Sequence, residues 1–119
     1  MNKEFSKRKD IWIVNLDPTI GAEIKKSRPA VIISSDSIGK LPIKLISPIT
    51  KWKTYFEKNL WHIKIAPNDN NGLSELSAVD VLQTRCVDVQ RLVKKIGDIT
   101  DQEMEQITLG IGGIIEYST

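Results

Sequence analysis

The stretch IWIVNLDPTIGAEIKKSRPAVIIS (residues 11–34) contains the pattern from which the fold can be inferred. Two apolar runs rich in β-branched residues, Ile11–Leu16 and Pro29–Ser34, flank a polar segment. Runs of this length bounded by turn residues are typical of β-strands. A proline has no backbone N–H to donate to a neighbouring strand, but it is tolerated at the first residue of a strand, where the second run has it. Because Thr19–Ser27 has no helical apolar stripe, we predict two strands joined by a loop.

Three later segments also have the composition of strands. Pro42–Thr50 is short and largely apolar, and Asn59–Pro67 alternates with period two. In that alternation His62 shares a side with Leu60 and Lys64, which we expect to be the exposed side. Ser77–Val89 is long enough to bend or bulge into two pieces.

The segment ITDQEMEQITLGIGGIIEY (residues 99–117) has a helical pattern instead. Thr100 and Glu103 have the spacing of a capping box, and Ile99 and Met104 that of a hydrophobic staple. Apolar residues then recur at helical spacing at Met104, Ile107, Ile111 and Ile114. A helix is therefore predicted to end the chain.

Three glycines interrupt this helical pattern, at Gly110, Gly112 and Gly113. Each weakens a helix by up to roughly 1 kcal/mol relative to alanine, so they indicate close approach of another backbone rather than helix propensity. Five or so strands followed by a terminal helix predict a mainly β fold, namely a small, strongly bent barrel.

Composition sets the broad class of protein. With 119 residues, 40% hydrophobic and 27% charged, the chain fits one globular domain, 1–119, with no membrane span. No long apolar signal region follows MNKEFSKRKD, so we expect a cytoplasmic protein with a flexible extension at residues 1–9. The lone Cys86 excludes an internal disulfide framework and a cysteine-based zinc site, and we expect a small strand residue there.

Charge is distributed unevenly along the chain. Residues 1–64 contain thirteen Lys and Arg against six Asp and Glu, whereas residues 65–119 contain four against nine. A basic half of a small protein raises the local concentration of a polyanion, and an acidic half on another face does not oppose this. Ordinary solvated charge is the alternative interpretation.

Arg28 is the first candidate for chemistry. A residue before proline is pushed toward extended geometry, so the Arg28 side chain should leave the loop in a restricted direction. A guanidinium is always charged and matches phosphate oxygens, which suits it to stabilise charge that develops on a phosphate. A surface ion pair is the alternative. The nearest carboxylates in sequence, Asp17 and Glu23, either act as a base or pair with the two lysines before Ser27.

Two further segments have candidate ligand-binding residues. SPIT (Ser47–Thr50) ends an apolar strand with a hydroxyl, and Thr50 is suited to donate to a phosphate oxygen, unless it only terminates the strand. TKWKTYFEK (residues 50–58) interleaves lysines with Trp52, Tyr55 and Phe56. Such a mixture suits unpaired nucleotides, which stack on aromatic faces, although a loop whose aromatics fold back on the core is the alternative.

Taken together, DIWIVNLDPTIGAEIKKSRPAVIIS (residues 10–34), SPIT and VLQTRCVDVQRLVKKIGDI (residues 81–99) resemble the MazF/PemK family of toxins from bacterial type II toxin–antitoxin systems. The similarity covers nearly the whole chain after residue 9. It implies a compact SH3-like barrel of the MazF/CcdB type that forms a homodimer and cleaves single-stranded RNA without a metal or other cofactor. It also implies an antitoxin segment that lies over the same groove and inhibits the toxin.

The resemblance implies roles for individual residues. The family's catalytic arginine matches Arg28, its catalytic threonine or serine matches Thr50, and its loop glutamate matches Glu23, our candidate for the general base. The implied reaction is attack of the RNA 2′-hydroxyl on the adjacent phosphate, which leaves a 2′,3′-cyclic phosphate and a 5′-hydroxyl. The expected RNA contacts are Asp17, Thr19, Lys25, Lys26, Ser27, Ser47, Lys51, Trp52, Lys53 and Gln83.

Two other functions stay open at this point. The sister CcdB-type toxins share the fold and poison a topoisomerase, but the residues Glu116–Thr119 lack the tryptophan-bearing tail by which those toxins resemble one another. A non-catalytic module that binds single-stranded RNA or an antitoxin would keep the basic groove and lose the chemistry.

Overall fold

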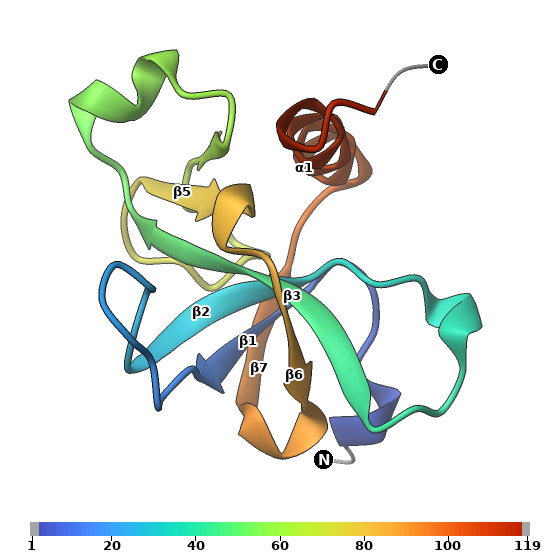
Figure 1. Cartoon of the computed structure of the whole chain (residues 1–119). Coiled ribbons are helices and arrows are strands. Elements are labelled where there is room, and N and C mark those ends of the chain that lie inside the picture. Colours follow the sequence, from blue (N-terminus) through green and yellow to red (C-terminus); the bar gives the residue numbers. More distant parts are fainter. Residues whose placement is uncertain (1–2, 118–119) are drawn as a thin grey trace.

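The computed structural model of the chain describes residues 3–117, apart from the side chain of Glu4. Residues 1 and 2 of the predicted extension and the last two residues of the tail discussed above lie outside the described part. The strands are β1 (Asp10–Asn15), β2 (Ser27–Ile32), β3 (Ile43–Lys51), β4 (His62–Ile65), β5 (Ser77–Asp80), β6 (Arg85–Asp88) and β7 (Leu92–Asp98), and the α-helix is α1 (Asp101–Ile114) (Figure 1).

The strands form one antiparallel seven-stranded sheet in the order β4-β5-β3-β2-β1-β7, with β6 also paired to β3. β3 has two partners along one edge, because Ile46 pairs with Arg85 of β6 and Ile49 pairs with Val79 of β5. A 3₁₀ helix, Val81–Gln83, separates β5 from β6. The predicted break of Ser77–Val89 into two pieces is therefore confirmed.

The strands bend strongly, but the sheet does not close on itself. β4 and β7 are the two ends of the strand order, and no ladder joins them within residues 3–117. The prediction of a mainly β fold, a small barrel of strongly bent strands with a C-terminal helix, is confirmed, and the barrel is an open one.

The sequence did not predict β7. Only its first residue, Leu92, is buried, and Lys94 and Lys95 are exposed. β7 is an end strand, and exposed lysines are typical of such edges because they discourage pairing with a second sheet. An edge strand of this kind lacks the apolar composition by which the central strands are recognised.

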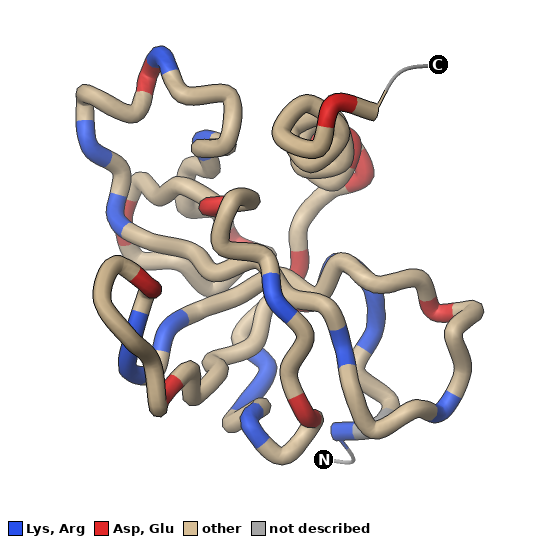
Figure 2. The backbone as a smooth tube through the Cα atoms, viewed as in Figure 1, with Lys and Arg blue, Asp and Glu red and all other residues tan. Residues whose placement is uncertain are grey.

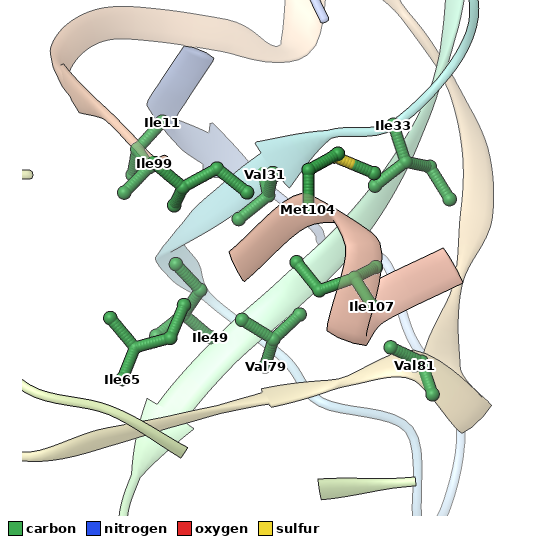
Figure 3. Packing of buried hydrophobic residues seen from close by; sticks show 10 residues of the cluster. All are labelled: Ile11, Val31, Ile33, Ile49, Ile65, Val79, Val81, Ile99, Met104 and Ile107. Carbon is green, nitrogen blue, oxygen red and sulfur yellow. The ribbon is translucent and has the colours of Figure 1, made fainter. Parts of the chain in front are cut away.

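Both faces of the sheet are buried, which explains the near-continuous apolar runs of β1 and β2. Figure 3 shows one core, in which Met104 and Ile107 of α1 pack over Val31, Ile49 and Val79 of the sheet. The second core contains no helix and forms where the sheet curls on itself. Its buried members are Trp12, Val14, Leu16, Ala30, Ile32, Ile46, Val87, Val89 and Leu92.

The beginning of α1 follows the predicted motif. Thr100 Oγ1 accepts from the Glu103 N–H at 3.1 Å, and Glu103 Oε1 accepts from the Thr100 N–H at 2.9 Å. The close approach of another backbone that was predicted for the glycines is confirmed at Gly110, whereas Gly113 approaches only a side chain. A Cβ at Gly110 would lie 3.2 Å from the Leu60 carbonyl oxygen, and one at Gly113 would lie 2.7 Å from Leu60 Cδ1. A Cβ at Gly112 would meet its nearest atom only at 3.8 Å.

The position of His62 is a correction to the sequence analysis. Its side chain is only 8% exposed, and its ring stacks on Phe56 with centroids 3.6 Å apart. His62 Nε2 lies 3.5 Å from Asp80 Oδ2. The 3₁₀ helix Thr54–Lys58, which follows β3, folds Phe56 over the His62 ring, so His62 is covered, whereas Leu60 and Lys64 on the same side are exposed as expected.

Residues 3–9 lie against the sheet. The Lys9 N–H donates to the Ile32 carbonyl at 2.9 Å, and the Ile99 N–H donates to the Lys9 carbonyl at 3.0 Å. Lys9 Nζ bonds Asp101 Oδ1 at 2.6 Å, and this bond holds the pKa of Asp101 below its usual 3.8. These contacts give the segment a defined position. Its predicted flexibility and the single-domain assignment stay predictions.

The charge asymmetry of the sequence is also spatial. α1 contains Asp101, Glu103 and Glu105 but no Lys or Arg. Figure 2 shows acidic positions on α1 at the upper right, whereas cations lie along the β1–β2 loop and the segment after β3 on the left. Within residues 3–117, no helix has the length and apolar character needed to cross a bilayer.

Candidate active site

Arg28 and Thr50 meet because of the register between β2 and β3. This antiparallel ladder ends with Ala30 paired to Pro48, and the same register, continued by two residues beyond the ladder, leads from Arg28 to Thr50. Both residues are half-buried, and both line one cleft of about 480 Å³. The structure thus brings together the two residues that the sequence analysis selected, and their chemical roles stay predictions.

The Arg28 guanidinium is only partly occupied by protein acceptors. Its Nε donates to the Lys25 carbonyl at 3.2 Å, which ties the side chain to the end of the loop before β2. A guanidinium has five N–H donors, and this is the single bond that the group forms within residues 3–117. One donor therefore fixes the orientation, and the others are free to bind an anionic ligand.

A turn-rich loop, residues 66–76, forms another wall of the cleft and contributes Glu75. Asn71 is fully buried and bonds the Ala66 carbonyl, while the Asn70 carbonyl accepts from the Asp98 N–H of β7 at 2.9 Å. Gly72 has φ +69°, and a Cβ there would collide with the Ile96 carbonyl. These contacts fix the course of the loop, and the exposed Glu75 side chain lines the cleft from it.

Two cations also line the cleft, Lys51 from the end of β3 and Lys94 from β7. Lys94 pairs across the ladder with Ile13, which is a wall residue of the same cleft. The sequence analysis missed both Glu75 and Lys94. LVKKIGD has no alternation that would have identified Lys94, so the residue is found only once that segment is recognised as a strand beside β1.

The loop between β1 and β2 is held by its own polar groups. Glu23 Oε1 accepts from the Ile20 N–H at 2.6 Å, and Asp17 Oδ1 accepts from the Lys26 N–H at 3.0 Å and from Thr19 Oγ1 at 3.2 Å. Neither carboxylate forms an ion pair with a lysine among the described residues. Their present partners are backbone and hydroxyl groups that shape the loop.

Glu23 lines a second cleft, of about 540 Å³, rather than the one that contains Arg28. Gln83 lies in the same cleft and clamps the loop, because its Oε1 accepts from the Ile24 N–H at 2.6 Å and its Nε2 donates to the Ala22 carbonyl at 3.1 Å. Gln83 therefore positions the loop, and both of its amide atoms already have partners.

Two arginines that the sequence analysis did not select fix the beginning of the same loop. Arg85 Nη1 donates to the Leu16 carbonyl at 3.1 Å, and Arg91 Nη1 donates to the carbonyls of Asn15 and Asp17. Carbonyl contacts of this kind depend on the fold and leave no motif in the sequence.

The remaining predicted RNA contacts differ in how accessible they are. Lys25, Lys26, Ser27, Lys51 and Lys53 are exposed, and Thr19 is half-buried. Ser47, by contrast, is fully buried and shares a 2.7 Å hydrogen bond with Thr84 Oγ1. The expectation that Ser47 contacts RNA is therefore wrong for this conformation, because its hydroxyl holds the junction between β3 and the turn after β5.

The aromatic segment after β3 is divided between the core and the surface. Phe56 is 7% exposed, whereas Tyr55 is 70% exposed. Trp52 is half-buried, contacts the Phe56 ring edge-on at 5.7 Å, and has Lys64 Nζ 4.6 Å from its ring centroid. The alternative in which the aromatics fold back on the core thus holds for Phe56, while nucleotide stacking stays a prediction, for which Tyr55 offers the most accessible aromatic face of the segment.

The pKa of Asp80, at the end of β5, differs from the usual value of an aspartate. Burial raises its pKa above the usual 3.8, and the neighbouring His62 opposes part of this rise. The pair lies beside the aromatic stack of Phe56 and His62 rather than in the Arg28 cleft. Among the residues that the structure describes, no cluster of three or more His, Cys, Asp or Glu has an arrangement that could hold a metal ion.

The bent sheet, the C-terminal helix and a cleft lined by Arg28, Thr50 and two lysines define a small β protein with a cationic cleft. Comparison with known proteins gives the family. The family model described as "PemK-like, MazF-like toxin of type II toxin-antitoxin system" matches residues 7–115, and the chain belongs to this family. The resemblance inferred from the sequence is confirmed.

The individual relatives have low sequence identity to this chain. The chain is 28% identical over 120 residues to the endoribonuclease toxin ChpB of Escherichia coli, covering 98% of this chain and 99% of that protein. It is 28% identical over 102 residues to the endoribonuclease EndoA of Bacillus subtilis, covering 85% and 86%. The fold matches that of a mycobacterial endoribonuclease solved in complex with its cognate antitoxin, with a TM-score of 0.74 at 12% identity over 96% of this chain and 98% of that one.

Proposed function

We propose that this protein is an endoribonuclease toxin that cleaves single-stranded RNA without a metal ion. The observation that carries the proposal is the shared cleft of Arg28 and Thr50, which the β2–β3 register brings together. The names of the curated relatives, which are endoribonucleases, support the reaction class. Exposed cations around the cleft, Lys51 and Lys94, are suited to bind the RNA backbone.

In the proposed reaction the 2′-hydroxyl gives up its proton to a base as its oxygen attacks the adjacent phosphorus. The bond from phosphorus to the 5′-oxygen breaks, and that oxygen takes up a proton, so the products are a 2′,3′-cyclic phosphate and a 5′-hydroxyl. Arg28 neutralises the charge that develops on the phosphate, and the Thr50 hydroxyl donates to a phosphate oxygen and orients it. No covalent intermediate with the protein forms.

Two carboxylates are candidates for the base. Glu23 lies in the loop before β2 and would need that loop to move, since it lines the second cleft and caps the Ile20 N–H. Glu75 lines the Arg28 cleft and lies on a loop held by buried Asn71. Because a base must reach the proton that it removes, the position of Glu75 favours this residue.

The test is incubation of the purified protein with a mixed pool of single-stranded RNA in the presence of a chelator. We expect products with 2′,3′-cyclic phosphate and 5′-hydroxyl ends, and loss of about 100-fold or more of the cleavage rate in Arg28→Ala. Thr50→Val, which keeps the shape and removes the hydroxyl, serves as the matched variant. Circular dichroism and thermal melting verify that each variant is folded.

The outcomes separate this proposal from the two other functions. Supercoiling-dependent DNA breaks without RNA products would indicate a topoisomerase poison. RNA binding without products in the wild-type protein would indicate a non-catalytic module. Cleavage that stops with the chelator and returns with a divalent cation would contradict the metal-independent chemistry.

The partners of the proposed toxin follow from its family. We propose a cytoplasmic homodimer that a cognate antitoxin inhibits by lying over the RNA groove, since an acidic and apolar peptide would complement the cations around Arg28. Sedimentation of the isolated protein tests the dimer. Competition between an antitoxin encoded beside this toxin and RNA tests the shared groove.

A further inference from the structure

Another pocket, distinct from both the Arg28 cleft and the Glu23 cleft, lies where residues 3–9 meet the beginning of β3. Its walls include several lysines. It has a volume of about 560 Å³, and its lining includes Phe5, Ser6, Lys7, Asp36, Lys40 and Lys44. None of these residues lines the Arg28 cleft. Phe5 and Ser6 also precede residue 7, where the match to the family model begins, so the pocket depends partly on sequence outside the shared family region.

Lys44 is the most unusual residue of this pocket. It is only 9% exposed, and its Nζ donates to the Ser6 carbonyl at 3.1 Å. An ammonium group has three donors, and burial of its charge is unfavourable unless anions or acceptors surround it. Among the described side chains, no carboxylate lies within ion-pair distance of Lys44 Nζ, so two of its donors have room for an anionic ligand.

Ser6 contributes a second buried polar group without a partner. The residue is 4% exposed, and its Oγ forms no hydrogen bond within the described part of the chain. Buried hydroxyls are nearly always hydrogen-bonded in folded proteins, so each exception needs a physical explanation. A bound oxygen-rich anion would satisfy both the Ser6 hydroxyl and the Lys44 ammonium.

The rim of the pocket adds charge and an aromatic surface. Lys7 and Lys40 are exposed at the rim, against one carboxylate, Asp36. One oxygen of the Asp36 carboxylate already has a hydrogen-bond partner, because Oδ1 accepts from the Arg8 N–H at 2.8 Å. Phe5 is 65% exposed, so its ring offers an accessible aromatic face beside these charges.

The pocket is held in place by hydrogen bonds of the neighbouring backbone. The Lys7 N–H donates to Asp10 Oδ2 at 2.9 Å, and the Ser6 N–H donates to the Lys3 carbonyl at 3.1 Å. Asp10 in turn accepts from Lys95 Nζ at 3.2 Å. Lys44 and Ser6 are therefore ordered before any ligand arrives, which lowers the entropic cost of binding.

We propose that this pocket binds a nucleotide. The phosphate accepts from Lys44 Nζ and Ser6 Oγ, Lys7 and Lys40 neutralise its remaining charge, and the base stacks on the Phe5 ring. The same chemistry is offered by a free nucleotide and by one nucleotide of a single-stranded RNA. The site is separate from the cleavage cleft and does not require the proposed RNA cleavage to be correct.

The test is a titration of the full-length, ¹⁵N-labelled protein with adenosine 5′-monophosphate at low salt, followed by amide chemical shifts. We expect saturable shifts at Ser6, Lys7 and Gly39, which surround the pocket. Lys44→Met keeps the length of the side chain and removes the charge, and should weaken the affinity at least about tenfold. Lys40→Ala changes only an exposed rim residue, so it weakens binding without the risk of unfolding.

Matched ligands and variants make the result decisive. Inorganic phosphate should bind more weakly than the nucleotide, and Phe5→Leu should remove that difference. Arg28→Ala should keep the shifts, so failure here is distinguishable from failure of the cleavage proposal. A 2′-O-methyl RNA oligomer that shifts Ser6, Lys7 and Gly39 at lower concentration than the nucleotide does, in the Arg28→Ala protein, identifies RNA as the source, and equal affinity at these residues identifies a free nucleotide. No saturable shift with the nucleotide, or unchanged affinity in both Lys44→Met and Lys40→Ala, would overturn the proposal.

Discussion

At the scale of single residues, the two carboxylates near the cleft give the sharpest test of the proposed chemistry. Glu75 lines the cleft that contains Arg28, whereas Glu23 accepts a 2.6 Å bond from the Ile20 N–H. If Glu75 is the base, Glu75→Gln should lower kcat by about 100-fold or more, because general base catalysis contributes about that much. Glu23→Gln should lower kcat less than about tenfold, through its effect on the loop.

Glu75→Gln keeps the size of the side chain, so its melting temperature should stay near that of the wild type. Cleavage of a defined RNA under single-turnover conditions measures the chemical step in both variants. The opposite order, with Glu23→Gln the more damaging change, would assign the base to the β1–β2 loop and require that loop to close over the substrate.

Asp80 predicts a dependence of stability on pH. Because burial raises its pKa above 3.8 in the folded protein, the native state holds this proton at pH values where the unfolded chain has lost it. The free energy of unfolding should therefore decrease as pH rises from 3.8 through the raised pKa of Asp80. Asp80→Asn cannot titrate, so its unfolding free energy should change less over that range. Urea unfolding at a series of pH values measures both slopes, and equal slopes would rule out this role for Asp80.

At the scale of elements, the glycines of α1 provide a matched pair. A Cβ at Gly110 would lie 3.2 Å from both Ile63 Cδ1 and the Leu60 carbonyl oxygen, so Gly110→Ala should destabilise the protein by about 1–3 kcal/mol through overpacking. At Gly112 the nearest atom is 3.8 Å away, so Gly112→Ala should stabilise it by about 0.5–1 kcal/mol through helix propensity.

Chemical denaturation of the two alanine variants at one temperature measures this difference. The same sign for both would show that packing against Leu60 is not what selects glycine at position 110. The comparison is robust because the substitutions are chemically identical and lie two residues apart in one helix.

Elements that depend on local chemistry were predictable from the sequence, and those that depend on a neighbour were not. The cap at Thr100 and Glu103 follows from side chains three residues apart, and both of its hydrogen bonds form. β7 is recognisable only beside β1, because its own residues are mostly exposed. The alternation around His62 was read correctly from the sequence. Its burial was not predictable, because the Phe56 ring that covers it belongs to another element, the 3₁₀ helix Thr54–Lys58.

At the scale of the whole molecule, the sequence located Arg28, Thr50 and Lys51 of the candidate site but neither Glu75 nor Lys94. Arg28 and Thr50 stand out because each lies at the end of an apolar run, and the order of the strands then brings them together. Glu75 and Lys94 reach the same cleft from a turn and an edge strand far along the chain. Their contribution depends on contacts between distant segments, which neither composition nor spacing records.

The separation of charge predicts how RNA binding responds to salt. Lys94 lines the cleft, whereas its neighbour Lys95 is paired with Asp10 at 3.2 Å. If the cleft binds the RNA backbone, Lys94→Ala should reduce the slope of log affinity against log salt by about 0.7, since each phosphate contact to a single strand contributes that much. Lys95→Gln should leave the slope unchanged. Binding of a 2′-O-methyl RNA at several salt concentrations measures both slopes without cleavage. If both variants reduce the slope of log affinity against log salt equally, RNA binding depends on the overall charge of the protein and not on contacts in the cleft.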